Sequence, residues 1–209
     1  MPFPAPPLTD DFLASLRAAT RALHAEAERS GFVRELLAGR ATREVYVLWL
    51  RNLWTAYATL ERRLTEQGHA ALADTRVMRA SALAADLQTL RGPRWRDELP
   101  LLPAGRAYAA AIEPASGARL AAHAYVRYLG DLNGGRVLAR VVARSLGLDA
   151  AALRFYAFDT EPAALERAYR AALIQAGGGA GAWAAAAEEA ASAFRHNIAL
   201  SEAVLAPGG

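Results

Sequence analysis

Residues 125–135, with the sequence YVRYLGDLNGG, combine one carboxylate and one amide with three glycines. Apolar residues recur at helical spacing on both sides of this stretch, yet a glycine inside a helix costs about 1 kcal/mol relative to alanine. A helix without side chains there offers bare backbone on which a large flat ligand fits, with Asp131 and Asn133 beside it. The alternative is a glycine hinge or a close helix crossing, and the glycine pattern alone favours that alternative.

A second candidate group is the imidazole of His24. Thr20 and Glu28 lie one helical turn away on either side, so both share its helical face. An axial imidazole bonded to a metal through Nε2 needs an acceptor for its Nδ1–H group, and Glu28 has the position for this. From the residues alone, a solvated glutamate that pairs with a neighbouring arginine is the more common arrangement.

Three other histidines compete with His24 as metal ligands: His69, His123 and His196. His69 lies in a polar, loop-like stretch, and we expect it on the surface. His196 has Arg195 and Asn197 as neighbours and is expected to be a polar residue on a helix face. His123 lies near the start of the glycine-containing helix and is therefore the serious rival.

These residues must be positioned by helices, because strand-like alternation is absent. Thr42, for example, caps a helix in which apolar residues from Tyr46 to Leu64 repeat at steps of three and four. We expect helices over approximately 9–30, 42–68, 76–90, 105–112, 116–147, 161–177 and 183–204, a short segment at 32–38, an irregular stretch at 95–103 and a helical turn within 149–158. The pattern predicts an all-α, bundle-like fold in one domain, residues 1–209, with 1–8 as a flexible lead-in.

The composition excludes several classes of protein. The 209-residue chain has no cysteine, which excludes disulfides, thiolate ligation and iron–sulfur clusters. All 24 basic residues are arginine, which excludes a lysine Schiff base. The net charge of +3 is modest and the arginines are dispersed, so we predict no nucleic-acid binding. No signal peptide or membrane span is evident, and we expect a cytoplasmic protein that does not contact the membrane.

The stretch YVRYLGDLNGG, with RVLARVVARSLGL after it, closely resembles the distal-helix signature of the haem oxygenase family. LRAATRALHAEAE at 16–28 is similar to the proximal helix of that family, and FYAF at 155–158 and FRHNIALSEAV at 194–204 also match. The resemblance runs from about Leu8 to about Leu205. It implies a single-domain helical bundle with haem between a proximal helix and a glycine-kinked distal helix.

On the proximal side, the resemblance implies that His24 is the iron ligand and Glu28 its hydrogen-bond partner, with Thr20 on the same face. Arg17, two turns before His24, matches a basic residue that meets a haem propionate. Arginine suits this role because it can hold a carboxylate through two hydrogen bonds.

On the distal side, the resemblance implies that Gly130 and Gly134 let backbone lie on the haem. Asp131 then holds a water that delivers protons during oxygen activation, supported by Tyr57 and Arg127, which match family positions. Asn133 is a further candidate for this network. Two more residues of the motif, Tyr125 and Gly135, are expected in the haem-binding surface.

At the propionate edge, Arg170 matches a propionate-binding residue of the family. Glu166 stands where animal relatives have a propionate-binding lysine, so Arg167 is expected to compensate, or the haem to be rotated in its plane. This departure leaves open which meso carbon is attacked. Phe194 and Asn197 match last-helix residues that pack against the haem pocket, although core packing explains them equally well.

The implied activity is that of a haem-degrading monooxygenase. Haem b would be both substrate and cofactor, with O2 and external electrons, and the products biliverdin, CO and Fe(II). Because no glycine fingerprint follows a strand, the donor would be a separate ferredoxin, reductase or small reductant, and a monomer is expected. Two alternatives stay open: a haem carrier or sensor without turnover, and a helical protein of this architecture that binds no haem.

Overall fold

The computed structural model describes residues 11–206, in which all regular secondary structure is helical and no strand is present. The α-helices are α1 (Asp11–Glu28), α2 (Gly31–Leu37), α3 (Arg43–Glu66), α4 (Ala80–Arg91), α5 (Trp95–Glu98), α6 (Pro103–Ile112), α7 (Gly117–Ala124), α8 (Gly130–Leu146), α9 (Pro162–Ala176) and α10 (Trp183–Ala203). Three-residue 3₁₀ turns lie at 150–152, 154–156 and 180–182. The predicted all-α bundle is confirmed, and the predicted lead-in at 1–8 lies outside the described residues, as does the predicted start of the first helix at residue 9.

Helix α3 is the centre of the bundle, as its apolar pattern predicts. Thr42 caps it by accepting a hydrogen bond from the Val45 backbone nitrogen at 3.4 Å. Its apolar residues are buried at every predicted position: Tyr46, Trp49, Leu50, Leu53, Tyr57, Leu60 and Leu64. They join one continuous core to which all ten α-helices contribute.

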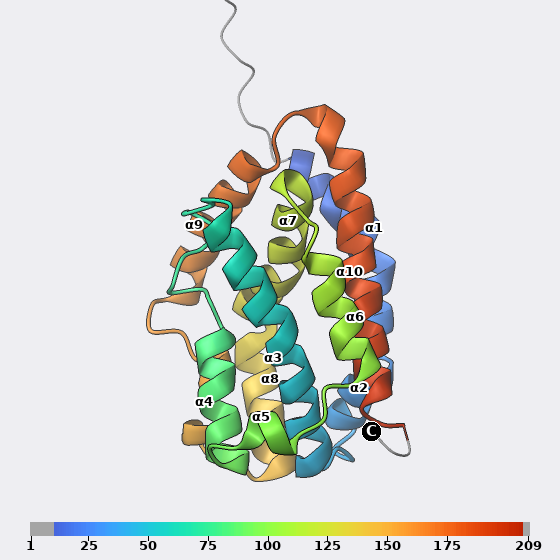
Figure 1. The fold of residues 1–209 in the computed structure, drawn as a ribbon, viewed down its shortest axis with the longest axis vertical. Helices are drawn as coiled ribbons and strands as arrows, with labels where there is room; N and C mark the ends of the chain where they lie inside the picture. Colours follow the sequence, from blue (N-terminus) through green and yellow to red (C-terminus); the bar gives the residue numbers. More distant parts are fainter. Residues whose placement is uncertain (1–10, 207–209) are drawn as a thin grey trace, which may run out of the picture.

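Helices α1 and α10, the first and last of the chain, run side by side along one edge of the bundle (Figure 1) and pack closely over most of their length. The corner between α1 and α2 also rests on α10. Gly31 adopts a positive φ of 53° there, and a Cβ at this position would overlap the Ser201 backbone. The side chain of Ser201 accepts a hydrogen bond from the Val33 nitrogen at 3.2 Å. The placement of α1 therefore depends on α10.

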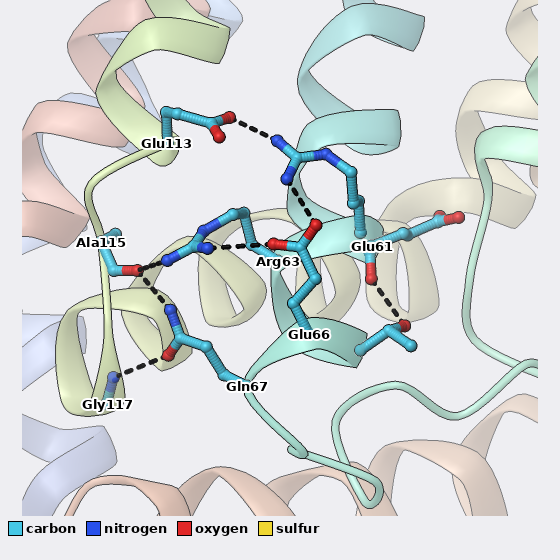
Figure 2. A network of polar contacts seen from close by, with 9 residues as sticks. Glu61, Arg63, Glu66, Gln67, Glu113, Ala115 and Gly117 are labelled. Atoms are coloured by element: carbon cyan, nitrogen blue, oxygen red, sulfur yellow. Dashed lines mark hydrogen bonds and ion pairs between the residues drawn. The ribbon is translucent and has the colours of Figure 1, made fainter.

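The C-terminal end of α3 holds the connection between α6 and α7, as Figure 2 shows. Gln67 donates to the Ala115 carbonyl at 2.8 Å and accepts from the Gly117 nitrogen at 3.4 Å. Arg63 donates to the same carbonyl at 3.5 Å and pairs with Glu66 at 3.0 Å. These bonds fix the point at which α7 begins, and α7 leads directly into the 125–135 stretch.

The long helix predicted over 116–147 is irregular, but at a different place from the predicted glycine kink. A five-residue π turn at Tyr125–Leu129 separates α7 from α8, whereas Gly130 has ordinary helical angles of −60° and −48°. The chain therefore departs from α geometry before the glycines and not at them. The π turn is held by tertiary packing: the Tyr128 ring lies edge-on to Tyr57 and Tyr169, and its hydroxyl donates to Glu61 at 3.2 Å.

Two other boundaries also differ. The stretch 95–103, expected to be irregular, begins with the short helix α5, because Trp95 is buried against Trp54. Helix α4 begins at Ala80 and not at 76, because Glu61 accepts hydrogen bonds from the backbone nitrogens of Arg79 and Ala80 and so caps the helix from α3. Within residues 11–206, no helix has the length and apolarity to cross a bilayer.

Candidate functional site

A polar cluster gathers three of the predicted distal residues. The Tyr57 hydroxyl of α3 donates to Asp131 Oδ2 of α8 at 2.6 Å. Arg127, in the π turn, has its guanidinium carbon 5.6 Å from the Tyr57 ring centroid and donates to Asn197 Oδ1 of α10 at 3.0 Å. Side chains from three separate helices and the π turn thus converge around Asp131 and Arg127.

Burial dominates the acid–base properties of this cluster. It raises the pKa of Asp131 to about 6, although Arg127 and the Tyr57 hydrogen bond oppose the shift. Burial also raises the pKa of Tyr57, and the Asp131 carboxylate adds to the rise. For Arg127, burial works against the charge, but the surrounding tyrosines and Asp131 outweigh it and raise its pKa. At neutral pH the cluster therefore holds a fixed cation beside a carboxyl group poised to exchange a proton.

The glycines of α8 divide into two environments. A Cβ at Gly130 or Gly134 would meet no atom within 4 Å, so the helix presents bare backbone to open space at both positions. Gly135 is buried instead, and a Cβ there would lie about 4 Å from Tyr156 and Phe158. Gly130 and Gly134 fit the predicted flat-ligand surface, whereas Gly135 packs against the segment 155–158. Asn133 is exposed and donates to its own helix at the Leu129 carbonyl, 2.8 Å away.

His24 presents its imidazole to solvent on α1. Its side chain is 62% exposed, its Nδ1 is 3.6 Å from Glu28 Oε1, and its ring centroid is 5.8 Å from that of Phe194 on α10. The Nδ1–Oε1 separation is longer than a hydrogen bond but within reach of one after a small side-chain rotation. Thr20 is buried and donates to the Leu16 carbonyl at 2.8 Å, so its hydroxyl is engaged by its own helix.

The other histidines are less suited to ligation. His123 is fully buried, and its Nε2 lies 2.9 Å from Glu189 Oε1 on α10. His196 is half-buried and stacks on Tyr108 with ring centroids 5.5 Å apart. His69 is half-buried in the turns after α3. Within the described part of the chain, no cluster of three or more His, Asp or Glu side chains that could hold a metal ion is present.

The predicted propionate-binding residues differ in exposure and in ion pairing. Arg17 and Arg167 are exposed, and each lacks an ion-pair partner among residues 11–206. Arg170 instead donates from Nε to Glu166 Oε1 at 2.9 Å, and its Nη2 forms an ion pair with the same oxygen at 2.9 Å. Tyr125 is half-buried at the start of the π turn. In this chain Glu166 therefore engages the arginine that is expected to bind a propionate.

Two residues that the sequence did not indicate belong to the cluster. Tyr108 of α6 is fully buried, its ring centroid is 6.0 Å from the Arg127 guanidinium carbon, and its hydroxyl has no hydrogen-bond partner among residues 11–206. Glu61 supports the cluster through Tyr128, and burial raises its pKa. Tyr108 lies in an alanine-rich helix without a motif, so no local signal could have identified it. Glu61 follows Tyr57 by one turn, a spacing that could have suggested a shared face.

The donor set fits a haem. One side supplies an accessible imidazole with a carboxylate behind it, which is a common axial arrangement. The other supplies a helix surface without Cβ atoms at Gly130 and Gly134 and the half-buried Asp131, whose carboxyl pKa is raised. Helix α10 joins the two sides, because Phe194 lies against His24 and Asn197 bonds Arg127.

The amino-acid sequence is similar to those of known proteins over most of its length. A family model described as "Heme oxygenase" matches residues 10–203. "Heme oxygenase 1" of Homo sapiens is 30% identical over 207 residues, which cover 93% of this chain and 72% of the relative. "Heme oxygenase 1" of Synechocystis sp. is 32% identical over 170 residues, which cover 77% of this chain and 70% of the relative.

Solved structures give the same result. The crystal structure of heme oxygenase-1 from Synechocystis sp. PCC6803 in complex with heme superposes with a TM-score of 0.86 at 28% identity, covering 93% of this chain and 92% of that one. Heme oxygenase from Leptospira interrogans superposes with a TM-score of 0.82 at 27% identity, covering 92% and 98%. The family match across most of the length, together with this helical architecture, leads to one conclusion: the chain belongs to the haem oxygenase family.

Proposed function

We propose that this chain cleaves haem to biliverdin, CO and Fe(II) with O2 and external electrons, and that it holds the haem between His24 and the Gly130–Gly134 surface. The observation that carries the proposal is the Tyr57–Asp131 hydrogen bond beside bare helix backbone, in a member of the haem oxygenase family. The haem supplies both the metal at which O2 is reduced and the ring carbon that is oxidised.

On the proximal side, His24 is the axial ligand through Nε2. Glu28 accepts a hydrogen bond from Nδ1–H, which fixes the tautomer and orientation of the ring. Phe194 packs against the imidazole and limits its rotation, with the two centroids 5.8 Å apart. Arg17, Arg167 and Arg170 at the rim are the cations that pair with the propionates.

On the distal side, Asp131 positions a water and relays the protons that O2 reduction consumes. A pKa of about 6 suits this role, because both protonation states are accessible near neutral pH. Tyr57 orients the carboxyl, and Arg127, held by Asn197, fixes the charge beside it. Gly130 and Gly134 have no side chain, so they leave room for the ring against the helix backbone.

Electrons come from a separate protein or a small reductant. A ferredoxin or a reductase with acidic side chains on its surface is attracted by the net positive charge of this chain, +3. The enzyme works as a monomer.

The test is a single-turnover assay in air of the haem-loaded protein with ascorbate or a ferredoxin–reductase pair, in the presence of catalase and an iron chelator. For the wild type we expect loss of the Soret band with formation of a biliverdin isomer and CO. For Asp131→Ala we expect retained haem binding and a biliverdin yield that is lower by about 10². Asn133→Ala, which removes an exposed amide in the same turn, is the matched control and should turn over normally.

Two outcomes would count against the proposal. A persistent Soret band or a stable oxygenated ferrous complex in the wild type would indicate a haem carrier or sensor. Normal turnover by Asp131→Ala would remove Asp131 from the proton relay.

A further inference from the structure

A cluster of two arginines and two tryptophans lies between α3 and α5, formed by residues other than those of the haem site. It consists of Arg51, Trp54, Trp95 and Arg96, which we call the Arg–Trp cluster. The indole rings of Trp54 and Trp95 meet edge-on, with centroids 5.1 Å apart. Each guanidinium lies over both rings: Arg51 at 5.8 and 5.6 Å from the two centroids, and Arg96 at 4.8 and 4.5 Å.

The charge of Arg51 is not compensated inside the protein. Its residue surface is only 8% exposed, and a buried arginine is ordinarily paired with a carboxylate. Within residues 11–206, neither Arg51 nor Arg96 forms an ion pair. Arg51 Nη1 donates to the neutral Thr55 hydroxyl at 3.0 Å, and its Nε is buried without a hydrogen-bond partner in the part of the chain that the structure describes. Burial and the nearby charge of Arg96 both lower the pKa of Arg51.

The neighbouring carboxylates do not neutralise the pair. Glu98 on α5 is taken by Arg91 at 3.5 Å and Arg94 at 3.1 Å. Asp97, next to Arg96 in sequence, is exposed and makes no ion pair in the described residues. The aromatic faces attract the cations, but each such contact contributes only about 0.5–2 kcal/mol, which does not replace a counter-ion for a buried guanidinium.

We propose that the Arg–Trp cluster binds a phosphate dianion, free or carried as a phosphate monoester, between the Arg51 and Arg96 guanidiniums. A doubly charged tetrahedral anion matches two uncompensated cations, and guanidinium groups bind its oxygens in pairs. Arg96 is exposed and provides the entry side, while Arg51 provides the buried side. The indoles hold both guanidiniums in place before the anion arrives, which lowers the entropy cost of binding. The site does not depend on haem or on the proposed activity.

The experiment is a calorimetric titration of the full-length protein with inorganic phosphate, and separately with adenosine 5′-monophosphate, in a buffer of low ionic strength. We expect saturable binding by the wild type and a dissociation constant raised about tenfold or more in Arg96→Gln, because each lost charge-assisted hydrogen bond is a large part of the affinity. Arg51→Gln should have the same effect, and Arg96→Gln, at an exposed position, serves alone if Arg51→Gln fails to fold. Arg144→Gln is the charge-matched control, an exposed arginine at the end of α8, and should bind as the wild type does.

The two titrants distinguish the source of the phosphate. Equal affinity for both supports a site for the phosphate group alone, and tighter binding of the monophosphate supports a nucleotide-type monoester. The proposal is overturned if neither titrant gives a saturable heat, or if Arg96→Gln and Arg144→Gln bind equally well.

Discussion

At the scale of single residues, Asp131 is the main acid–base group of the polar cluster. Its carboxyl group is held by Tyr57 on one side and influenced by Arg127 on the other, yet burial keeps its pKa at about 6, above the ordinary 3.8. A carboxyl group in this state is a better proton relay than a solvated aspartate. The same shift costs stability at neutral pH, because the folded protein must ionise a group that its interior disfavours.

This cost predicts the direction in which stability changes with pH. The folded pKa of Asp131 is raised, so between about pH 4 and pH 6 the unfolded state loses its proton first and the free energy of unfolding falls as pH rises. Relative to Asp131→Asn, which has no charge to bury, the wild type should lose about 2–3 kcal/mol between pH 4 and pH 7. Urea unfolding of both proteins at several pH values measures the difference. Asp159→Asn, at an exposed position, keeps Asp131 and should follow the pH dependence of the wild type, whereas a parallel pH dependence for wild type and Asp131→Asn would contradict the raised pKa of Asp131.

Glu166 is the second residue with a clear expected effect. It engages Arg170 through two contacts of 2.9 Å, so a haem propionate must displace it to use that arginine. In Glu166→Gln the haem should dissociate about threefold more slowly, since a solvent-accessible ion pair of this kind is worth about 0.2–1 kcal/mol. Transfer of haem to a high-affinity acceptor protein measures the rate. Glu188→Gln, an exposed glutamate on α10, is the charge-matched control; equal rates in both variants would mean that Arg170 does not hold the haem.

At the scale of helices, α8 carries a conflict between stability and the proposed activity. Gly130 is helical, and within residues 11–206 a Cβ at Gly130 or Gly134 would meet no neighbouring atom within 4 Å. Alanine would make a better helix at these positions. Under the proposed function, the two glycines leave room for the haem against the helix backbone at a cost in stability.

Gly134→Ala tests this conflict. The variant should be more stable to urea than the wild type by up to about 1 kcal/mol, while haem affinity and turnover fall because the methyl group enters the space of the ring. Gly177→Ala is the contrasting control, because its Cβ would lie 2.6 Å from the Phe12 ring and should destabilise the fold. A Gly134→Ala protein that binds and cleaves haem normally would show that no ligand lies on this surface.

The sequence predicted helices well where local signals define them. Thr42 caps α3 and its apolar repeat is buried as expected, and Glu161 caps α9 through two backbone nitrogens. The π turn at 125–129 was not predicted, because the contacts that hold Tyr128 come from α3 and α9, which are distant in sequence.

The same distinction applies to the candidate site. Residues within a motif, such as Arg127 and Asp131, were identified and lie in one cluster. The ion pair between Glu166 and Arg170 was not predicted, because the sequence gives the spacing of the two residues but not their side-chain conformations. Tyr108 was missed because its partners belong to other helices.

At the scale of the whole molecule, helix α1, which carries His24, is held in place by α10, the last helix of the chain. Gly31 ends the α1–α2 corner with a positive φ directly against the backbone of Ser201 and Glu202. No other residue type fits, because any Cβ would be both conformationally strained and in steric conflict with α10. This contact sets how α1 sits against the rest of the bundle.

Gly31→Ala should therefore lower the free energy of unfolding by more than about 2 kcal/mol and weaken haem binding through displacement of α1. Gly39→Ala is the matched control. Gly39 also has a positive φ, 69°, but nothing lies within 4 Å of its Cβ position, so only the conformational strain of about 1 kcal/mol applies. Chemical denaturation of the two variants measures the difference, and equal losses would mean that the α1–α2 corner tolerates movement against α10.

The π turn has a consequence for how this chain can change in length. A π turn holds one residue more than an α turn over the same rise, and each residue rotates an α-helix by about 100°. The deletion of one residue between Ala124 and Gly130 would therefore let the segment close to α geometry while α8 keeps nearly the same orientation relative to α7. The deletion of one residue inside α7 has no such outlet and would rotate Asp131 and the Gly130–Gly134 surface by that angle relative to the start of α7. A change in length by one residue is thus absorbed at the π turn but not in the helix before it.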